Sequence, residues 1–148
     1  MGPDGVGLYD WHTGTFHLRA SDGTTTVLPW QPPGWSTSWI PLAGDWNELP
    51  TPSPFPAPPP FPIPPGFDIG GDGRDTVGYY DPGNCTFWLR DDLGDVPVPQ
   101  VRSIPWTPPG VACGPSLQPL QPITGRWCGD GRDKPGIYDP ATGIFYLR

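Results

Sequence analysis

Residues 129–148 read GDGRDKPGIYDPATGIFYLR, and two earlier stretches repeat this phrase: residues 71–90 (GDGRDTVGYYDPGNCTFWLR) and residues 4–19 (DGVGLYDWHTGTFHLR). The two longer copies align without a gap, and the first copy is shorter at its start. In each copy an Asp-Gly pair leads into an apolar segment that ends at an Asp, and four turn residues precede a second segment that ends at an Arg. Two such segments joined by a loop rich in Pro, Gly and Asn are typical of a β-hairpin. We therefore interpret the chain as a repeat protein with three hairpins.

The second segment of each hairpin alternates in a regular way. A Phe and a Leu in every copy alternate with one variable residue, and the sets are Phe16, Leu18 and His17; Phe87, Leu89 and Trp88; Phe145, Leu147 and Tyr146. Successive side chains of a strand point to opposite faces of a sheet. We expect the Phe/Leu face to form the core, and the variable residue and the closing Arg to face outward.

The similarity extends beyond the hairpins. The string Pro-Trp-x-Pro-Pro-Gly occurs at residues 29–34 and 105–110, and related strings, PLAGDWN and PITGRWC, follow at 41–47 and 122–128. The sequence predicts a third strand that runs into each Pro-Trp and a fourth short strand before the next Asp-Gly pair. Four tryptophans that recur between the units are expected in the core: Trp30, Trp46, Trp106 and Trp127.

Composition limits the fold class. The chain has 148 residues, among them 26 Pro and 21 Gly, and these two residue types disfavour helices. The 8 Trp, 5 Tyr and 6 Phe supply the apolar area that a disordered chain lacks. We predict one all-β domain over residues 1–148, made of repeated antiparallel hairpins in four-stranded, blade-like units with a propeller-like or β-solenoid arrangement.

A proline-rich insertion at residues 48–66 interrupts the second copy. Prolines favour an extended polyproline II conformation. The segment could brace its own domain, link domains, or bind an aromatic groove of a partner. Thr51 and Ser53, each flanked by prolines, would suit O-glycosylation of a secreted chain.

Charge and cysteine content narrow the function classes. A formal net charge of −7 with a single lysine, Lys134, argues against nucleic-acid binding. No apolar run approaches the roughly 18 to 20 residues of a membrane span. The three cysteines lack metal-binding spacing, so we expect one disulfide and one free thiol outside the cell, with Cys113–Cys128 the most local pair. A reduced chain in the cytosol is the alternative.

The strings GDWN (44–47), GDGRDTVGYYDP (71–82) and TFWLR (86–90) resemble the Gly-Asp-Trp-Asp-Gly-Asp-Gly repeats of bacterial secreted and surface proteins, which are similar to the FG-GAP/VCBS repeat families. The resemblance covers the three hairpins and their lead-ins, about half of the chain. It implies a blade-like β-repeat module outside the cell, often forming propellers, that serves adhesion or scaffolding. It also implies Ca²⁺ in the acidic loop, as in many family members.

The acidic loops depart from the family pattern. A loop of the form D-x-D-x-D-G offers side-chain oxygens at alternate positions to Ca²⁺, which takes roughly six to eight oxygens. The candidate ligands are Asp45, Asn47, Asp68, Asp72 and Asp75 for the middle copy, and Asp130 and Asp133 for the last copy. Arg126 and Cys128 stand at the first two ligand positions of the last copy, so Arg126 could replace the cation's charge against Asp130 or Asp133. In the other interpretation the Asp-Gly pairs are metal-free turns.

The sequence contains no catalytic constellation that we recognise. His12 and His17 are the only histidines, and no Ser or Cys occurs in a nucleophile motif, so we expect no enzymatic activity. Trp11, Trp35, Trp39 and Trp88 would suit stacking on sugar rings if their faces are exposed. The last hairpin has no third and fourth strands after it, and open sheet edges recruit other chains. We therefore expect a secreted or surface-exposed structural or adhesive module that forms a homo-oligomeric ring or a filament, with a lectin-like module or a calcium-stabilised protein-interaction domain as alternatives.

Overall fold

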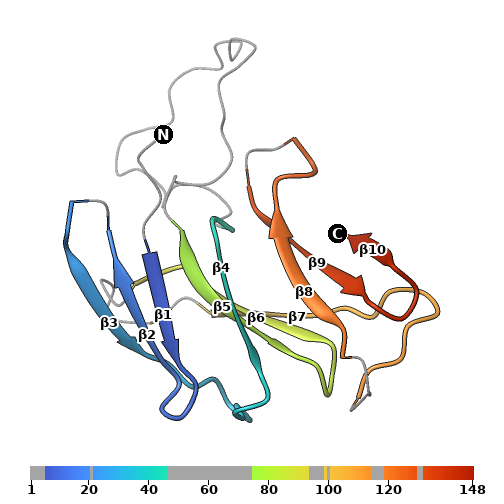
Figure 1. The fold of residues 1–148 in the computed structure, drawn as a ribbon, viewed down its shortest axis with the longest axis horizontal. Coiled ribbons are helices and arrows are strands. Elements are labelled where there is room, and N and C mark those ends of the chain that lie inside the picture. The colour runs from blue at the N-terminus through green and yellow to red at the C-terminus, as the bar shows by residue number, and fades with distance from the viewer. Residues whose placement is uncertain are drawn as a thin grey trace, which may run out of the picture.

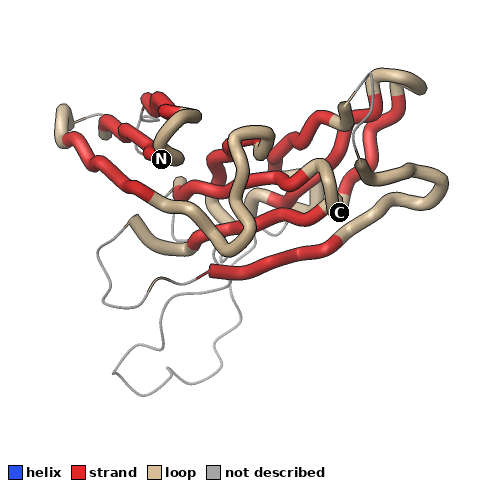
Figure 2. The backbone as a smooth tube through the Cα atoms, turned by 90° about the horizontal axis from the view of Figure 1, so that it is seen from below, coloured by secondary structure: helices blue, strands red, loops and turns tan. Residues whose placement is uncertain are grey.

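The computed structural model of the chain describes residues 6–20, 22–46, 75–93, 99, 101–114, 119–129 and 132–148. Within these ranges the protein consists of strands, turns and loops, and Figure 2 shows no helix there. The predicted all-β class is therefore confirmed for the described part of the chain, which also holds no helix suited to crossing a membrane. The proline-rich insertion at 48–66, with Thr51 and Ser53, lies outside the described residues, and its conformation stays a prediction.

The described strands form three antiparallel sheets that follow one another along the chain (Figure 1). The first sheet contains β1 (Val6–Asp10), β2 (Thr15–Arg19) and β3 (Thr25–Pro29). The middle sheet contains β4 (Ile40–Gly44), β5 (Thr76–Asp81), β6 (Thr86–Arg90) and β7 (Val101–Pro105). The last sheet contains β8 (Gln121–Gly125), β9 (Lys134–Asp139) and β10 (Ile144–Leu147). All three predicted hairpins are present, as β1–β2, β5–β6 and β9–β10.

The same turn closes each hairpin. The carboxylate of Asp10, Asp81 or Asp139 accepts a hydrogen bond of 2.9 Å from the backbone N–H two residues later. It also accepts one of 2.7 to 2.8 Å from the side chain three residues later. Aspartate carboxylates commonly stabilise turns in this way. The last turn residue has positive φ in every copy, and is Gly14, Cys85 or Gly143.

The predicted third strand is confirmed, because β3 pairs with β2 and β7 pairs with β6. The predicted assignment of the fourth strand to the preceding unit is wrong. Strand β4 pairs with β5 and β8 pairs with β9, so this strand precedes its own hairpin. We call β4 and β8 the lead strands. The complete unit therefore consists of a lead strand, a hairpin and a third strand, in that order.

A Gly-x-Trp sequence holds each lead strand to its hairpin. A Cβ at Gly44 would lie 2.5 Å from the ring of Trp46, and a Cβ at Gly125 would lie 2.6 Å from the ring of Trp127, so only glycine admits the indole. The indole N–H then donates to the backbone carbonyl at the hairpin's closing Arg, at 3.2 Å for Arg90 and 3.0 Å for Arg148. This contact explains why the lead strand pairs with the hairpin that follows it in the chain.

The core lies between the sheets. Phe16 and Phe87 are 4 % and 0 % exposed, as the alternation predicts. Phe145 and Leu147, at the same positions of the last hairpin, are 61 % and 51 % exposed, so the prediction is wrong there. Each Phe/Leu face packs against the sheet that follows it, and the described residues place no sheet against the face of the last hairpin. Of the four recurring tryptophans, Trp30 and Trp46 are buried, and Trp106 and Trp127 are half-buried.

The second face of the hairpin is also part of the core, which the alternation did not predict. In the middle sheet Val77, Tyr79 and Trp88 pack on the first sheet, while Phe87 and Leu89 pack toward the last sheet. Every residue of β5 is therefore buried. The outward position expected for Trp88 is wrong, because a preceding sheet covers it.

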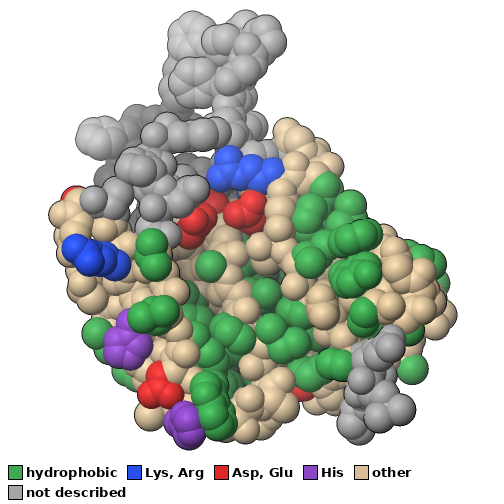
Figure 3. Space-filling model, viewed as in Figure 1, with side chains coloured by type: hydrophobic (Ala, Val, Ile, Leu, Met, Phe, Trp, Pro, Cys, Tyr) green, Lys and Arg blue, Asp and Glu red, His purple; other side chains and the backbone are tan. Residues whose placement is uncertain are grey.

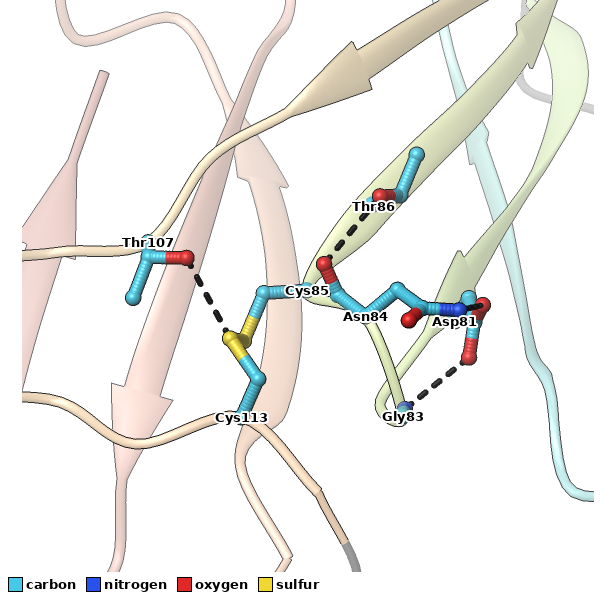
Figure 4. Close-up of a disulfide and its surroundings, with 7 residues drawn as sticks. All are labelled: Asp81, Gly83, Asn84, Cys85, Thr86, Thr107 and Cys113. Carbon is cyan, nitrogen blue, oxygen red and sulfur yellow. Dashed lines mark hydrogen bonds between the residues drawn. A yellow bond between two sulfur atoms is a disulfide. The ribbon is translucent and has the colours of Figure 1, made fainter.

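The disulfide joins Cys85 to Cys113 (Figure 4). Cys128 is an exposed free thiol. The expected Cys113–Cys128 pair is therefore wrong. Cys85 occupies the last turn residue of the middle hairpin, where the loop after β7 passes with Cys113 at a Cα–Cα distance of 5.5 Å. Cys128 instead lies beside the carbonyl oxygen of Arg148, at 3.7 Å from its Sγ.

Replacing Cys113 by Ser should lower the free energy of unfolding by about 3 kcal/mol, because the bond closes a loop with a sequence separation of 28 residues. The matched variant Cys128→Ser should leave stability unchanged. Chemical denaturation of both variants measures the difference. Equal stability of the two variants would contradict the observed pairing.

Candidate functional site

Tyr79 joins the first and middle sheets. Its ring centroid lies 5.2 Å from those of Phe16 and Trp30 and 5.6 Å from that of Tyr9. Its hydroxyl donates to the backbone carbonyl oxygen of Trp30 at 3.0 Å, and burial raises the pKa of this phenol. The Tyr79 side chain thus covers the aromatic face of the first sheet, and its buried hydroxyl finds a hydrogen-bond acceptor there.

Ile137 takes the corresponding place between the middle and last sheets. It occupies the same hairpin position as Tyr79, since Tyr79 is opposite Trp88 and Ile137 is opposite Tyr146. Ile137 is fully buried in a cluster with Tyr80, Phe87 and Leu89. Leu8 is the aligned residue of the first hairpin, and it is 73 % exposed.

The face that receives this side chain also recurs. A cross-strand Tyr–Phe pair forms its centre in each sheet, with ring centroids 4.9 Å apart for Tyr9–Phe16, 4.8 Å for Tyr80–Phe87 and 4.6 Å for Tyr138–Phe145. The first two pairs are covered by Tyr79 and Ile137, respectively. We name Tyr138, Phe145 and Leu147 the tail face. Phe145 and Leu147 are exposed and Tyr138 is half-buried, and Figure 3 shows hydrophobic side chains at the surface over the last sheet.

The first sheet exposes the face that carries Leu8, the residue equivalent to Tyr79 and Ile137, instead of the face with the Tyr–Phe pair. Leu8, His17 and Val27 lie side by side across its three strands, and all three are exposed. Val6 lies on the same side of β1 and is exposed as well. We name these four residues the head face. The two faces together carry five of the eight large hydrophobic residues that are exposed in the described part of the chain.

Sequence reasoning assigned Phe145 and Leu147 of the tail face to the core, and missed the head face. The signal was present, because Leu8, Tyr79 and Ile137 are apolar and each stands between the hairpin's Gly and Tyr. It was overlooked because alternation assigns one face of a strand to the core and does not show that a second sheet can cover the other.

The carboxylates of two predicted calcium sites meet across the interface between the middle and last sheets. The backbone N–H of Asp45 donates to the Asp133 carboxylate, and the backbone N–H of Asp133 donates to the Asp45 carbonyl oxygen, both at 2.8 Å. The Arg126 guanidinium lies 3.8 Å from the Asp45 carboxylate and 3.6 Å from that of Asp133. Arg126 thus supplies the positive charge at this place. Of its two predicted partners, Asp133 forms the ion pair, and Asp130 lies outside the described residues.

The remaining predicted calcium ligands are not brought together in the described structure. Asp75 is exposed at the start of β5, and Asn47, Asp68, Asp72 and Asp130 lie outside the described residues. Among the residues that the structure describes, no group of three His, Cys, Asp or Glu could hold a metal ion. Calcium binding by the middle loop stays a prediction.

The tryptophans proposed for sugar stacking differ in their surroundings. Trp39 is buried, with its ring centroid 5.9 Å from that of Trp88, and Trp35 and Trp88 are half-buried against the same cluster. The expected exposure is therefore wrong for Trp39. Trp11 alone of the four has an exposed ring, which lies at a tilt against the His12 ring with centroids 3.5 Å apart.

Two hollows on the described surface have volumes of about 200 and 230 Å³, below the roughly 300 to 1,000 Å³ of typical ligand pockets. His12 lies in the first hairpin turn, where Nδ1 is 3.6 Å from the Asp10 carboxylate. The hydroxyl of Thr13 hydrogen-bonds this carboxylate and lowers the pKa of Asp10, as turn chemistry requires.

No protein-family model, curated protein or solved structure matches the chain.

Exchanging Arg126 for Met should lower the free energy of unfolding by about 0.5 to 1 kcal/mol, because Asp45 and Asp133 lose a shared cation. In the Asp45→Asn background the same exchange should cost less. A double-mutant cycle measured by thermal unfolding gives the coupling. Strictly additive effects would contradict the proposed pairing, and Arg19→Met, at the end of the first hairpin, is the control.

Stability should fall as the pH rises above 10. Burial, and secondarily the charge of Asp81, raises the pKa of Tyr80 from 10.0 to about 12. The unfolded chain therefore releases a proton from this phenol between pH 10 and 12, while the folded chain retains it, so unfolding is favoured as pH increases. Denaturation midpoints across this range should decline less steeply for Tyr80→Phe than for the wild type. Equal slopes would contradict the assignment.

Proposed function

We propose that this chain is a non-catalytic structural or adhesive β-repeat module that works outside the cell and associates with copies of itself. One observation carries the proposal. Phe145 and Leu147 are 61 % and 51 % exposed, whereas the equivalent Phe87 and Leu89 are buried under the next sheet. A contiguous apolar face of this kind commonly marks a protein-interaction site.

A blade-like arrangement of the sheets is part of the proposal. The lead strands β4 and β8 lie alongside each other, and the Thr124 hydroxyl donates to the Ala43 carbonyl oxygen at 3.1 Å. Sheets that approach each other through equivalent strands are typical of propeller blades and solenoids. The resemblance to FG-GAP/VCBS repeats agrees with this arrangement. A propeller has roughly four to eight blades, more than the three described sheets, so self-association could supply the others.

The disulfide supports a location outside the cell. Cys85 is fully buried and bonded to Cys113, and such structural disulfides persist in oxidising compartments. The net charge of −7 suits a soluble extracellular surface.

Carbohydrate binding is the second candidate function, and it rests on Trp11. This ring is exposed at a hairpin turn beside Asp10 and His12, and aromatic faces stack on sugars. A calcium-stabilised interaction domain would depend on Asn47, Asp68, Asp72 and Asp130, which lie outside the described residues. Tryptophan fluorescence during titration with a glycan panel and with Ca²⁺ tests both alternatives.

Sedimentation velocity over a wide concentration range tests self-association. The wild type should shift from monomer to larger species as its concentration increases. Phe145→Arg should remain monomeric, because a buried guanidinium would lack a partner in the interface. Trp11→Arg, which changes an exposed aromatic residue outside both faces, should behave as the wild type. A wild type that stays monomeric at every concentration would overturn the proposal.

A further inference from the structure

We infer that association is head-to-tail: the head face of one copy (Val6, Leu8, His17, Val27) packs on the tail face of another (Tyr138, Phe145, Leu147). The inference rests on the proposed self-association and specifies its partner as a second copy of this chain. It also predicts which residues meet, with Leu8 of one copy against the Tyr138–Phe145 pair of the next.

The two interfaces inside the chain are the template. In each of them the face with the Tyr–Phe pair receives the apolar residue that stands between the next hairpin's Gly and Tyr, which is Tyr79 at the first interface and Ile137 at the second. The tail face retains the Tyr–Phe pair, with ring centroids 4.6 Å apart. The head face retains the inserted residue as Leu8, which is 73 % exposed. A second copy would therefore repeat contacts that the chain already makes twice.

The alternative symmetric contacts lack this complementarity. Two tail faces would oppose two Tyr–Phe pairs without an inserted side chain, and two head faces would contain no aromatic pair to receive Leu8. Each internal interface joins the Tyr–Phe face of one sheet to the opposite face of the next sheet. A contact between copies that follows the same arrangement joins a tail face to a head face, and is therefore heterologous. Such a contact generates a closed ring or an open filament.

Two differences make the intermolecular interface weaker than the internal ones. His17 stands where Trp88 and Tyr146 contribute half-buried aromatic rings to the internal clusters. The residue before each lead strand, Trp39 or Leu120, also adds to the internal clusters, and the head face has no described counterpart. The assembly should therefore be reversible and depend on protein concentration.

Complementary blocking variants test the polarity. Leu8→Arg disables the head face and leaves the tail face intact, and Phe145→Arg does the reverse. Both residues are more than half exposed, so the fold should tolerate either change, and unchanged thermal midpoints verify this. Each variant alone should remain monomeric. An equimolar mixture should form a dimer that grows no further, with twice the mass of one chain.

The other outcomes separate the two proposals. If Leu8→Arg alone still dimerises, the tail faces pair with each other, and the head-to-tail inference falls while self-association stands. If Phe145→Arg alone still dimerises, the head faces pair, with the same consequence. If the wild type is monomeric throughout, self-association itself is wrong.

His17→Trp provides a gain-of-function measurement. Trp is the residue found at this position in the middle hairpin, where it packs on the preceding sheet. The exchange should tighten the association of the wild type by about tenfold, as an added buried aromatic contact would. It should have no effect in the Phe145→Arg background. An unchanged association constant in the wild-type background would contradict burial of His17 in the interface.

Discussion

The structure depends on the insertion of one side chain into the aromatic face of the preceding sheet. Tyr79 fills the face formed by Tyr9, Phe16 and Trp30, and Ile137 fills the face formed by Tyr80 and Phe87. Sheets of three or four short strands expose much of their area, and they need a second layer to become stable. Because the middle sheet receives Ile137 on one face and inserts Tyr79 from the other, burial passes along the stack. The middle sheet, covered on both faces, is accordingly the most buried.

Local devices prepare each sheet for this contact. An Asp carboxylate closes the turn of each of the three hairpins, and a Gly-x-Trp sequence attaches the lead strand to the hairpin's closing Arg in the two sheets whose lead strand the structure describes. A residue with positive φ completes each turn, and in the middle hairpin that residue is Cys85, which ties the turn to the loop after β7. The Asp contacts join residues two or three positions apart and recur in all three hairpins, whereas the tryptophan contacts and the disulfide join residues 21 to 44 positions apart. The long-range contacts between sheets then depend on few side chains.

The hairpin turns are also what the sequence predicts best. Turn residues and alternation located the three hairpins, the recurring Pro-Trp string located the third strands, and Arg126 stood out as a positive charge at a ligand position. Three features could not be predicted from the sequence, because each depends on contacts between segments that are far apart in the chain. Pairing of the lead strand with the following hairpin depends on where Trp46 packs, the Cys85–Cys113 bond depends on a loop path, and the burial of Trp88 depends on a neighbouring sheet. The exposure of Phe145 follows from the same cause, since burial at this position requires a following sheet.

Hydrogen exchange in the Tyr79→Ala variant tests the central contact most directly. If insertion of Tyr79 holds the first sheet in place, the variant should lose stability on the order of 3 kcal/mol. The amides of β1–β3 should then exchange much faster, while those of β8–β10, held by Ile137, should keep most of their protection. Unchanged protection in β1–β3 would show that the first sheet is stable without the inserted side chain, and would contradict this account.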